Sequence, residues 1–277
     1  MRSAEPFVIR TPTMTRRWRI WAIGDLHLYN KGCIESEIDL MVQEIKDDPY
    51  AVWIGLGDYA DCITAYDPRF DAQEVAPDKR DNFFERLPAR IVDDVCTKFE
   101  PIAGQCLGLC RGNHEDKMET RHDIALTKDV CENLSTSKHT VRYLDYSAVF
   151  DLIFKSKRKK EEAHFKIFCH HGAGFGTTTG GKINKLKKVM TEVIDADIYM
   201  MGHSHEQIDL PLVQLYQDEN GVLRQKKKLG VITGSYLATY RDGCTSYGEK
   251  KLYSPVTLGS IAVTVVPATR RLGVEKR

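Results

Sequence analysis

The chain has 277 residues and a formal net charge of +1, with 42% hydrophobic and 29% charged residues. This composition is ordinary for a globular protein, and the length allows one sizeable core or two smaller ones. The near-zero net charge argues against binding to nucleic acid or membrane by general electrostatic attraction. No apolar run reaches the roughly 18 residues that a membrane span needs, and the basic N-terminal segment lacks the apolar stretch of a signal peptide. We therefore expect a cytoplasmic protein with no membrane partner.

The first half of the chain alternates predicted strands and helices. Strands are expected at 17–24, 51–56 and 105–110, and helices at 34–45, 84–99 and 116–133. Pro88 is expected to interrupt or kink the second of these helices, because proline lacks the N–H that a helix interior requires.

The second half is richer in predicted strands. They are expected as two strands within 140–154, at 165–169, at 197–201 and at several places in 208–266, with a basic helix after the glycine-rich segment 173–181. This mixture predicts a layered α/β architecture with more than one sheet.

Five of the predicted strands end in residues that carry oxygen or imidazole donors. In chain order these are Asp25-Leu26-His27, Gly57-Asp58, Arg111-Gly112-Asn113-His114-Glu115, His170-His171 and Gly202-His203-Ser204-His205. Taken singly, each is more simply explained as a turn or as a core histidine. In open α/β sheets, however, sites form outside the carboxyl ends of strands, and the joint occurrence of these motifs predicts one site.

The donors at these strand ends suit divalent cations. They are Asp25, His27, Asp58, Asn113, His170, His203 and His205. A mixed oxygen and nitrogen set without thiolate favours manganese, iron or zinc. Seven donors exceed the needs of one ion, whereas two ions bridged by a carboxylate and a hydroxide would use them all. Paired metals activate water and clamp the oxygens of a phosphoryl group.

The order Asp-x-His, Gly-Asp, Gly-Asn-His-Glu, His and Gly-His-x-His resembles the calcineurin-like metallophosphoesterase superfamily, from Asp25 to His205. The resemblance implies a four-layer α/β/β/α sandwich with two mixed β-sheets. It also implies a single domain over 1–277, with a motif core at about 17–207 and a strand-rich completion over 208–277. A weaker likeness, carried by the glycine-rich segment and the helix after it, is to phosphoesterases of phages and prophages.

The resemblance also implies roles for individual residues. Asp25, His27 and His205 would bind one metal, Asn113, His170 and His203 the other, and Asp58 would bridge them. Either His170 or His171 could be the ligand, and we favour His170 because it directly follows the predicted strand. His114 would bind the substrate phosphate or protonate the leaving oxygen. Asn113 would also touch the phosphoryl group.

Two features bear on the substrate. Asp58-Tyr59-Ala60-Asp61 is similar to the protein serine/threonine phosphatase branch, but Cys62-Ile63 follow where that branch has Arg-Gly. Arg111 is a candidate phosphate contact, because a guanidinium matches phosphate oxygens; the alternative is an ordinary exposed arginine at a strand end. The basic runs 155–160 and 182–188 could track a phosphate backbone or could be solvated faces.

We therefore expect an enzyme that hydrolyses phosphate esters by attack of a metal-bridging hydroxide. Its cofactors would be two divalent metal ions, manganese first and iron or zinc as alternatives. The alternatives for function are a nuclease or cyclic-nucleotide-type phosphodiesterase acting on a nucleotide or nucleic acid, a protein phosphatase, and a non-catalytic binding module on the same fold.

Overall fold

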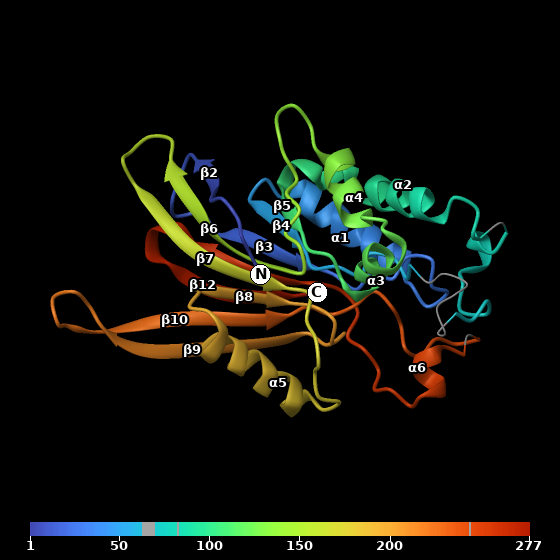
Figure 1. Ribbon diagram of the computed structural model, residues 1–277. Helices are drawn as coiled ribbons and strands as arrows, with labels where there is room; N and C mark the ends of the chain where they lie inside the picture. The colour runs from blue at the N-terminus through green and yellow to red at the C-terminus, as the bar shows by residue number, and fades with distance from the viewer. Residues whose placement is uncertain (63–69, 82, 244) are drawn as a thin grey trace.

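The computed structural model describes residues 1–62, 70–81, 83–243 and 245–277, with only the backbone of Tyr247. Within these residues the strands form two mixed sheets that lie face to face, and helices cover the outer face of each (Figure 1). The layers therefore follow the order α/β/β/α, which confirms the predicted fold class. Among the described helices, none is both long enough and apolar enough to cross a membrane.

One sheet has the strand order β12-β11-β3-β4-β5. Its members are β3 (Trp18–Ile23), β4 (Ala51–Gly55), β5 (Cys106–Leu109), β11 (Ile261–Val266) and β12 (Arg271–Lys276). β3, β4 and β5 are parallel and end at the same edge of the sheet, with Ile23 beside Gly55 and Gly55 beside Leu109. β11 and β12 are antiparallel additions, so this sheet contains strands from both ends of the chain.

The other sheet has the order β1-β6-β7-β8-β10-β9, and β2 also pairs with β6. Its members are β1 (Arg2–Ser3), β2 (Phe7–Thr11), β6 (Ser147–Ser156), β7 (Glu162–His170), β8 (Ile198–Met201), β9 (Ile208–Gln217) and β10 (Leu223–Ile232). β7, β8 and β10 are parallel, and His170, Met201 and Ile232 lie at their shared edge. Hairpins join β6 to β7 and β9 to β10.

The helices and helical turns lie on the two outer faces and in the connections at the ends of the sheets (Figure 1). They are α1 (Glu35–Asp47), α2 (Leu87–Phe99), α3 (Asn113–His122), α4 (Leu126–Leu134), α5 (Thr179–Lys188) and α6 (Tyr247–Lys250), with a π-helical turn η3 (Val189–Val193) and 3-10 turns η1 (Pro77–Lys79), η2 (Glu100–Gln105) and η4 (Pro267–Thr269). α1, α2 and α4 cover Trp21 and Trp53 of the first sheet. α5 and η3 cover Phe168 and Tyr199 of the second.

A third core lies between the two sheets, because side chains along a strand alternate between its faces. On β3, Ile20 and Ala22 point into this central core, whereas Trp21 and Ile23 point toward the helices. On β7, Phe165, Ile167 and Cys169 point into the central core. The strand ends of both sheets are thereby held together at one end of the sandwich.

Three elements differ from the sequence expectation. Pro88 lies in the first turn of α2, where the missing N–H is unpaired anyway, so it starts the helix and does not kink it. The predicted helix 116–133 is two helices, because Asp123 adopts a left-handed backbone conformation (φ 56°) and ends α3. Within 140–154 there is one long strand, β6, which pairs with β7 along its length.

Candidate metal centre

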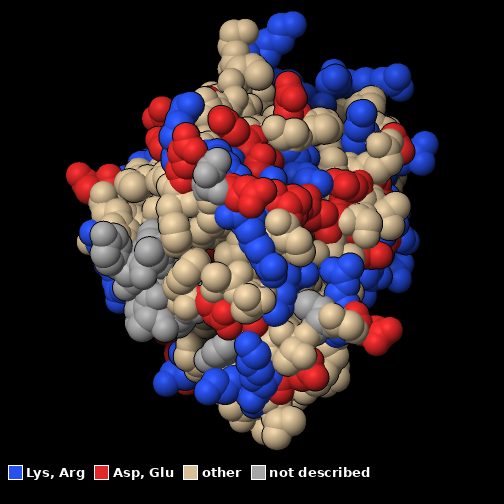
Figure 2. Space-filling model, turned by 90° about the vertical axis from the view of Figure 1, so that its right-hand side faces the viewer, with Lys and Arg blue, Asp and Glu red and all other residues tan. Residues whose placement is uncertain are grey.

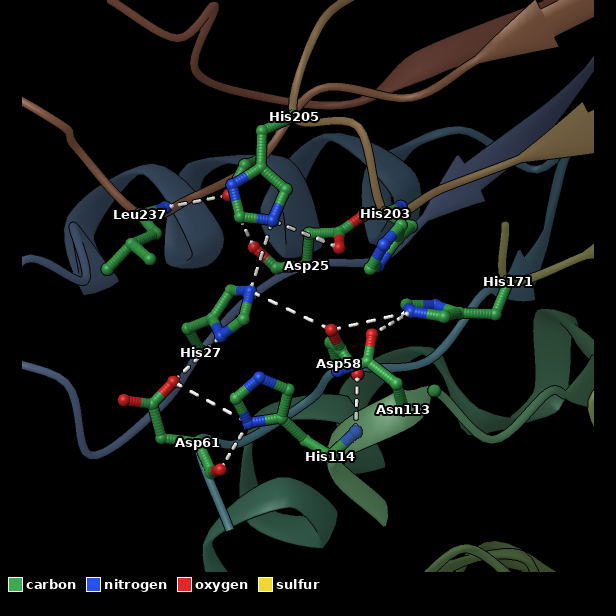
Figure 3. Close-up of polar contacts among 12 residues, drawn as sticks. Asp25, His27, Asp58, Asp61, Asn113, His114, His171, His203, His205 and Leu237 are labelled. Atoms are coloured by element: carbon green, nitrogen blue, oxygen red, sulfur yellow. Dashed lines mark hydrogen bonds and ion pairs between the residues drawn. The ribbon is translucent and has the colours of Figure 1, made fainter. Parts of the chain in front are cut away.

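Loops after β3, β4, β5, β7 and β8 meet where the two sheets share an end. Hydrogen bonds between the loops hold them together: the N–H of Asp25 donates to Gly57 O at 2.9 Å, and the N–H of Gly202 donates to His171 O at 2.9 Å. The N–H of His203 donates to Asp25 Oδ2 at 2.8 Å, which joins the first sheet to the second. Six of the seven predicted donors converge here, and His171 takes the place of His170 (Figure 3).

One donor group consists of Asp25, His27 and His205, whose ligand atoms lie within 4.8 Å of one another. His205 Nε2 lies 3.2 Å from Asp25 Oδ1 and 3.2 Å from His27 Nε2. Asp25 and His27 are buried. The two imidazole nitrogens and the carboxylate oxygen thus face a common point.

A second donor group consists of Asp58, His171 and His203, again within 4.8 Å, and Asn113 joins it. His171 Nε2 lies 2.9 Å from Asn113 Oδ1 and 3.4 Å from Asp58 Oδ2. His171 Nδ1 donates to Leu56 O at 2.7 Å, which leaves Nε2 as the nitrogen with a free lone pair.

Asp58 lies between the two groups. Its Oδ2 is 4.0 Å from His27 Nε2 and 3.4 Å from His171 Nε2. Its Oδ1 accepts the N–H of His114 at 3.0 Å, which fixes the carboxylate in this orientation. Figure 3 shows Asp58 with His27 on one side and His171 on the other.

His170 does not join the cluster, so the preference for His170 over His171 is corrected. β7 continues to His170, and side chains along a strand alternate between the two faces of the sheet. Cys169 faces the core between the sheets, so His170 faces the helices on the outer side, and residue 171 faces the inner side again. On the outer side, His170 contacts the ring of Phe168, which belongs to the core under α5, and its Nδ1 accepts the N–H of Gly172 at 2.7 Å. Burial lowers the pKa of His170 to about 4.

The backbone of the donor residues is strained. Five of them have positive φ, a conformation that non-glycine residues rarely adopt: Asp25 (54°), His27 (52°), Asp58 (54°), His203 (70°) and His205 (53°). Such strain persists only where the surroundings over-determine it, and it gathers at functional sites.

Glu115 supplies part of that restraint. From α3 its buried carboxylate accepts the N–H groups of Asp58 at 2.9 Å, Tyr59 at 2.8 Å and Gly112 at 2.8 Å. The loops after β4 and β5 therefore touch. A Cβ at Gly112 would collide with the Asp58 carboxylate, so glycine is required at that position.

Asp61 is a site residue to which the sequence reasoning assigned no role. Its Oδ1 lies 2.8 Å from His27 Nδ1, its Oδ2 accepts from Asn30 Nδ2 at 2.6 Å, and its backbone carbonyl accepts from His114 Nδ1. The sequence feature that could have identified Asp61 is its position three residues after Asp58. A carboxylate behind a ligating histidine fixes the tautomer of the ring.

The carboxylates of the cluster favour the protonated, positively charged forms of His27 and His171. Burial opposes protonation of His27, but Asp61 and then Asp58 outweigh it and raise its pKa to about 9. Burial likewise opposes the charge on His171, and Asp58 outweighs it and raises the pKa to about 10. Burial would raise the pKa of the Asp58 carboxyl, yet the neighbouring imidazoles hold it well below its usual range.

The residues present fit a pair of divalent cations. Asp25 Oδ1 is buried and has no hydrogen-bond partner among the described residues, although it faces the two nitrogens of its group. A buried anionic oxygen that accepts no hydrogen bond is costly, and a cation at this point would satisfy it. The remaining donors are imidazole nitrogens, carboxylates and one amide oxygen, which suit borderline and hard divalent ions.

A comparison with known protein families gives a match over the region that contains the site. The family model described as calcineurin-like phosphoesterase matches residues 19–207. The chain belongs to the calcineurin-like phosphoesterase family. The matched region contains all seven donors of the two groups. No curated protein matches the chain significantly.

Several solved structures are distantly similar. A predicted phosphoesterase from Streptococcus pneumoniae is 13% identical, with a TM-score of 0.35, over 90% of this chain and 84% of that one. Vps29 from Chaetomium thermophilum is 12% identical, with a TM-score of 0.34, over 93% and 94%. A metallophosphoesterase from Sphaerobacter thermophilus is 10% identical, with a TM-score of 0.38, over 94% and 89%.

Three residues were expected, from the family pattern or from chemistry, to contact substrate: Asn113, whose Oδ1 lies in the second donor group, His114 and Arg111. The buried ring of His114 lies beside His27, with ring centroids 5.0 Å apart, and Figure 3 shows the nitrogen not bonded to Asp61 turned toward the cluster. Arg111 is placed differently. Its guanidinium pairs with carboxylates of its own chain, Asp116 at 3.2 Å, Asp145 at 3.3 Å and Glu119. The geometry therefore favours a structural arginine over a phosphate contact.

Proposed function

We propose that the protein hydrolyses phosphate esters with two divalent cations. Asp25, His27 and His205 would hold one cation, Asn113, His171 and His203 the other, and Asp58 would contact both. The observation that carries the proposal is the position of Asp58 Oδ2, 4.0 Å from a nitrogen of one donor group and 3.4 Å from a nitrogen of the other. Manganese is the first candidate, with iron or zinc as alternatives.

When bound, the cations would lower the pKa of water and offset the negative charge of the phosphoryl oxygens. Two side chains of the protein would act directly on the substrate. His114 donates its Nδ1–H to the carbonyl of Asp61, so as an imidazolium it would give the proton on Nε2 to a leaving oxygen and keep the one on Nδ1. Asn113 Oδ1 lies 2.9 Å from His171 Nε2, so both atoms would face the same cation and the amide N–H of Asn113 would be free to donate to a phosphoryl oxygen.

The substrate is a phosphate ester, and the charges near the site do not select a polyanion. On the face turned to the viewer in Figure 2, basic and acidic residues are interspersed. The basic run 155–160 joins β6 to β7 at the end of β7 opposite His171. In it, Lys155 pairs with Glu162 at 3.2 Å and Lys159 with Glu161 at 3.6 Å. These observations support a solvated loop and a small phosphate ester as substrate.

The test is hydrolysis by metal-stripped protein reconstituted with Mn²⁺, assayed in parallel on a chromogenic phosphomonoester and a chromogenic phosphodiester. Activity should return with metal and should fall strongly in Asn113→Ala and His114→Ala. The ratio of the two rates decides between phosphatase and phosphodiesterase action. A protein that binds two metals but hydrolyses neither ester would instead support the binding-module alternative, and a protein that binds no metal would refute the proposal.

A further inference from the structure

The N-terminal end of α5 is attached to the loop that carries His203 and His205. Lys182, in the first turns of the helix, donates from Nζ to the carbonyl of Ser204 at 3.0 Å and pairs with Glu206 Oε2 at 2.8 Å. Thr179, one helical turn earlier, donates to Glu206 Oε1 at 2.6 Å. Residues three apart on a helix lie on the same face, so both side chains reach the loop together.

This loop needs an external restraint. Ser204 stands between His203 and His205, which have left-handed backbones with φ of 70° and 53°. Its hydroxyl Oγ is buried and has no partner among the described residues, so its side chain does not brace the turn. The peptide carbonyl of Ser204 is held by the ammonium of Lys182, and a charged donor makes a stronger hydrogen bond than a neutral one.

Lys182 differs from Lys187 and Lys188, the exposed lysines of the same helix. Its side chain is largely covered, with a relative exposure of 16%, and it points to the loop. Lys187 makes no contact with the loop that carries His203 and His205 among the interactions of the described residues, and Lys188, the last residue of α5, pairs with Glu192 of η3. The run 182–188 is a candidate for tracking a phosphate backbone, but the contacts of Lys182 are with its own chain.

We propose that Lys182 is a positioning residue for the metal centre: its bond to Ser204 holds His203 and His205 in their ligating orientation. This inference rests on the proposed function. His205 belongs to one donor group and His203 to the other, so a single lysine would set the geometry of both cation positions. Loss of a residue that orients metal ligands typically weakens metal binding by about 10–100-fold.

The experiment compares Lys182→Met with Lys187→Met, which removes the same charge from an exposed position of the same helix. The first readout is amide hydrogen exchange of residues 202–206 in metal-free protein, and the second is Mn²⁺ affinity by calorimetry. We expect exchange in the loop to accelerate at least about tenfold in Lys182→Met, and Mn²⁺ to bind about tenfold more weakly. Lys187→Met should match the wild type, and Lys182→Arg should recover part of the loss.

Glu206→Gln is a milder second variant, because it keeps Lys182 but removes the charge of its partner; it should shift both readouts in the same direction. The inference is overturned if loop exchange and Mn²⁺ affinity in Lys182→Met stay within about twofold of wild type. It is also overturned if KM for the ester rises while kcat and Mn²⁺ affinity do not change, because that pattern indicates a substrate contact. Failure of the wild type to hydrolyse esters would refute the proposed function alone, since the exchange comparison needs no catalysis.

Discussion

The carboxylate of Asp61 stands directly behind His27, with Oδ1 2.8 Å from Nδ1 of the imidazole. The N–H of that ring therefore points away from the cluster, and Nε2 faces His205 Nε2 at 3.2 Å. Asn30 holds the other carboxylate oxygen at 2.6 Å. A residue that no motif required thus decides which nitrogen of His27 can bind a cation.

Asp61→Asn should weaken Mn²⁺ binding by about 10–100-fold, because an amide cannot supply the charge that orients and polarises His27. Calorimetric titration of metal-stripped protein measures the change. Asp78→Asn, at an exposed position of η1, is the matched control and should bind Mn²⁺ as the wild type does. Equal affinity in the two variants would show that Asp61 does not orient the ligand.

His170 and His171 are adjacent in the chain, so replacing each in turn by alanine gives a matched comparison of metal binding. His171→Ala should lose about one of two bound Mn²⁺ equivalents, because Nε2 of His171 faces Asp58 and Asn113. His170→Ala should keep both, since its ring lies on the outer face of the sheet. Metal analysis after gel filtration counts the ions, and equal retention in the two variants would refute the assignment.

His114→Ala should lower kcat by about 10²–10³-fold while Mn²⁺ binding is retained, because the ring would act on the leaving oxygen. The loss should be larger for an alkyl phosphate than for a p-nitrophenyl phosphate, whose leaving group needs no proton. His122→Ala, exposed on the same helix, is the control. An equal loss with both esters would argue against a role for His114 as general acid.

The stability of metal-stripped protein should fall as the pH rises. The pKa of His27 is raised to about 9 and that of His171 to about 10, both above the value of about 6.5 for an unfolded histidine. Their contribution to the free energy of unfolding is complete below about pH 6.5 and is lost as the pH passes through 9 and 10. Thermal unfolding in EDTA should show Tm falling across this range. Saturating Mn²⁺ should flatten the curve, since it binds the neutral rings.

Glu115→Gln should lower the free energy of unfolding by about 3 kcal/mol, because the new amide group would oppose backbone N–H donors that now reach a carboxylate. Urea unfolding measures the loss. Glu132→Gln, exposed on α4, should change stability little. A Glu115→Gln protein as stable as the wild type would show that the contact between the two loops does not depend on this charge.

The amino-acid sequence by itself determined which strand ends carry donors. Asp25, Asp58 and Asn113 each follow a short apolar run, and the carboxyl ends of parallel strands necessarily share an edge. The family pattern supplied the order of the motifs and the two-sheet architecture. These features depend on residues that are close in the chain or recur at a regular interval, so they can be recognised from the sequence alone.

Only the tertiary structure decided the rest. The choice between His170 and His171 depended on where β7 ends and which of its faces meets the other sheet, and a change of one residue in that assignment exchanges the two sides. The carboxylates that occupy Arg111 and the contact of Lys182 with Ser204 join residues whose spacing carries no signal. Such contacts depend on how the loops of the two sheets pack against each other, and the spacing of residues along the sequence does not predict that packing.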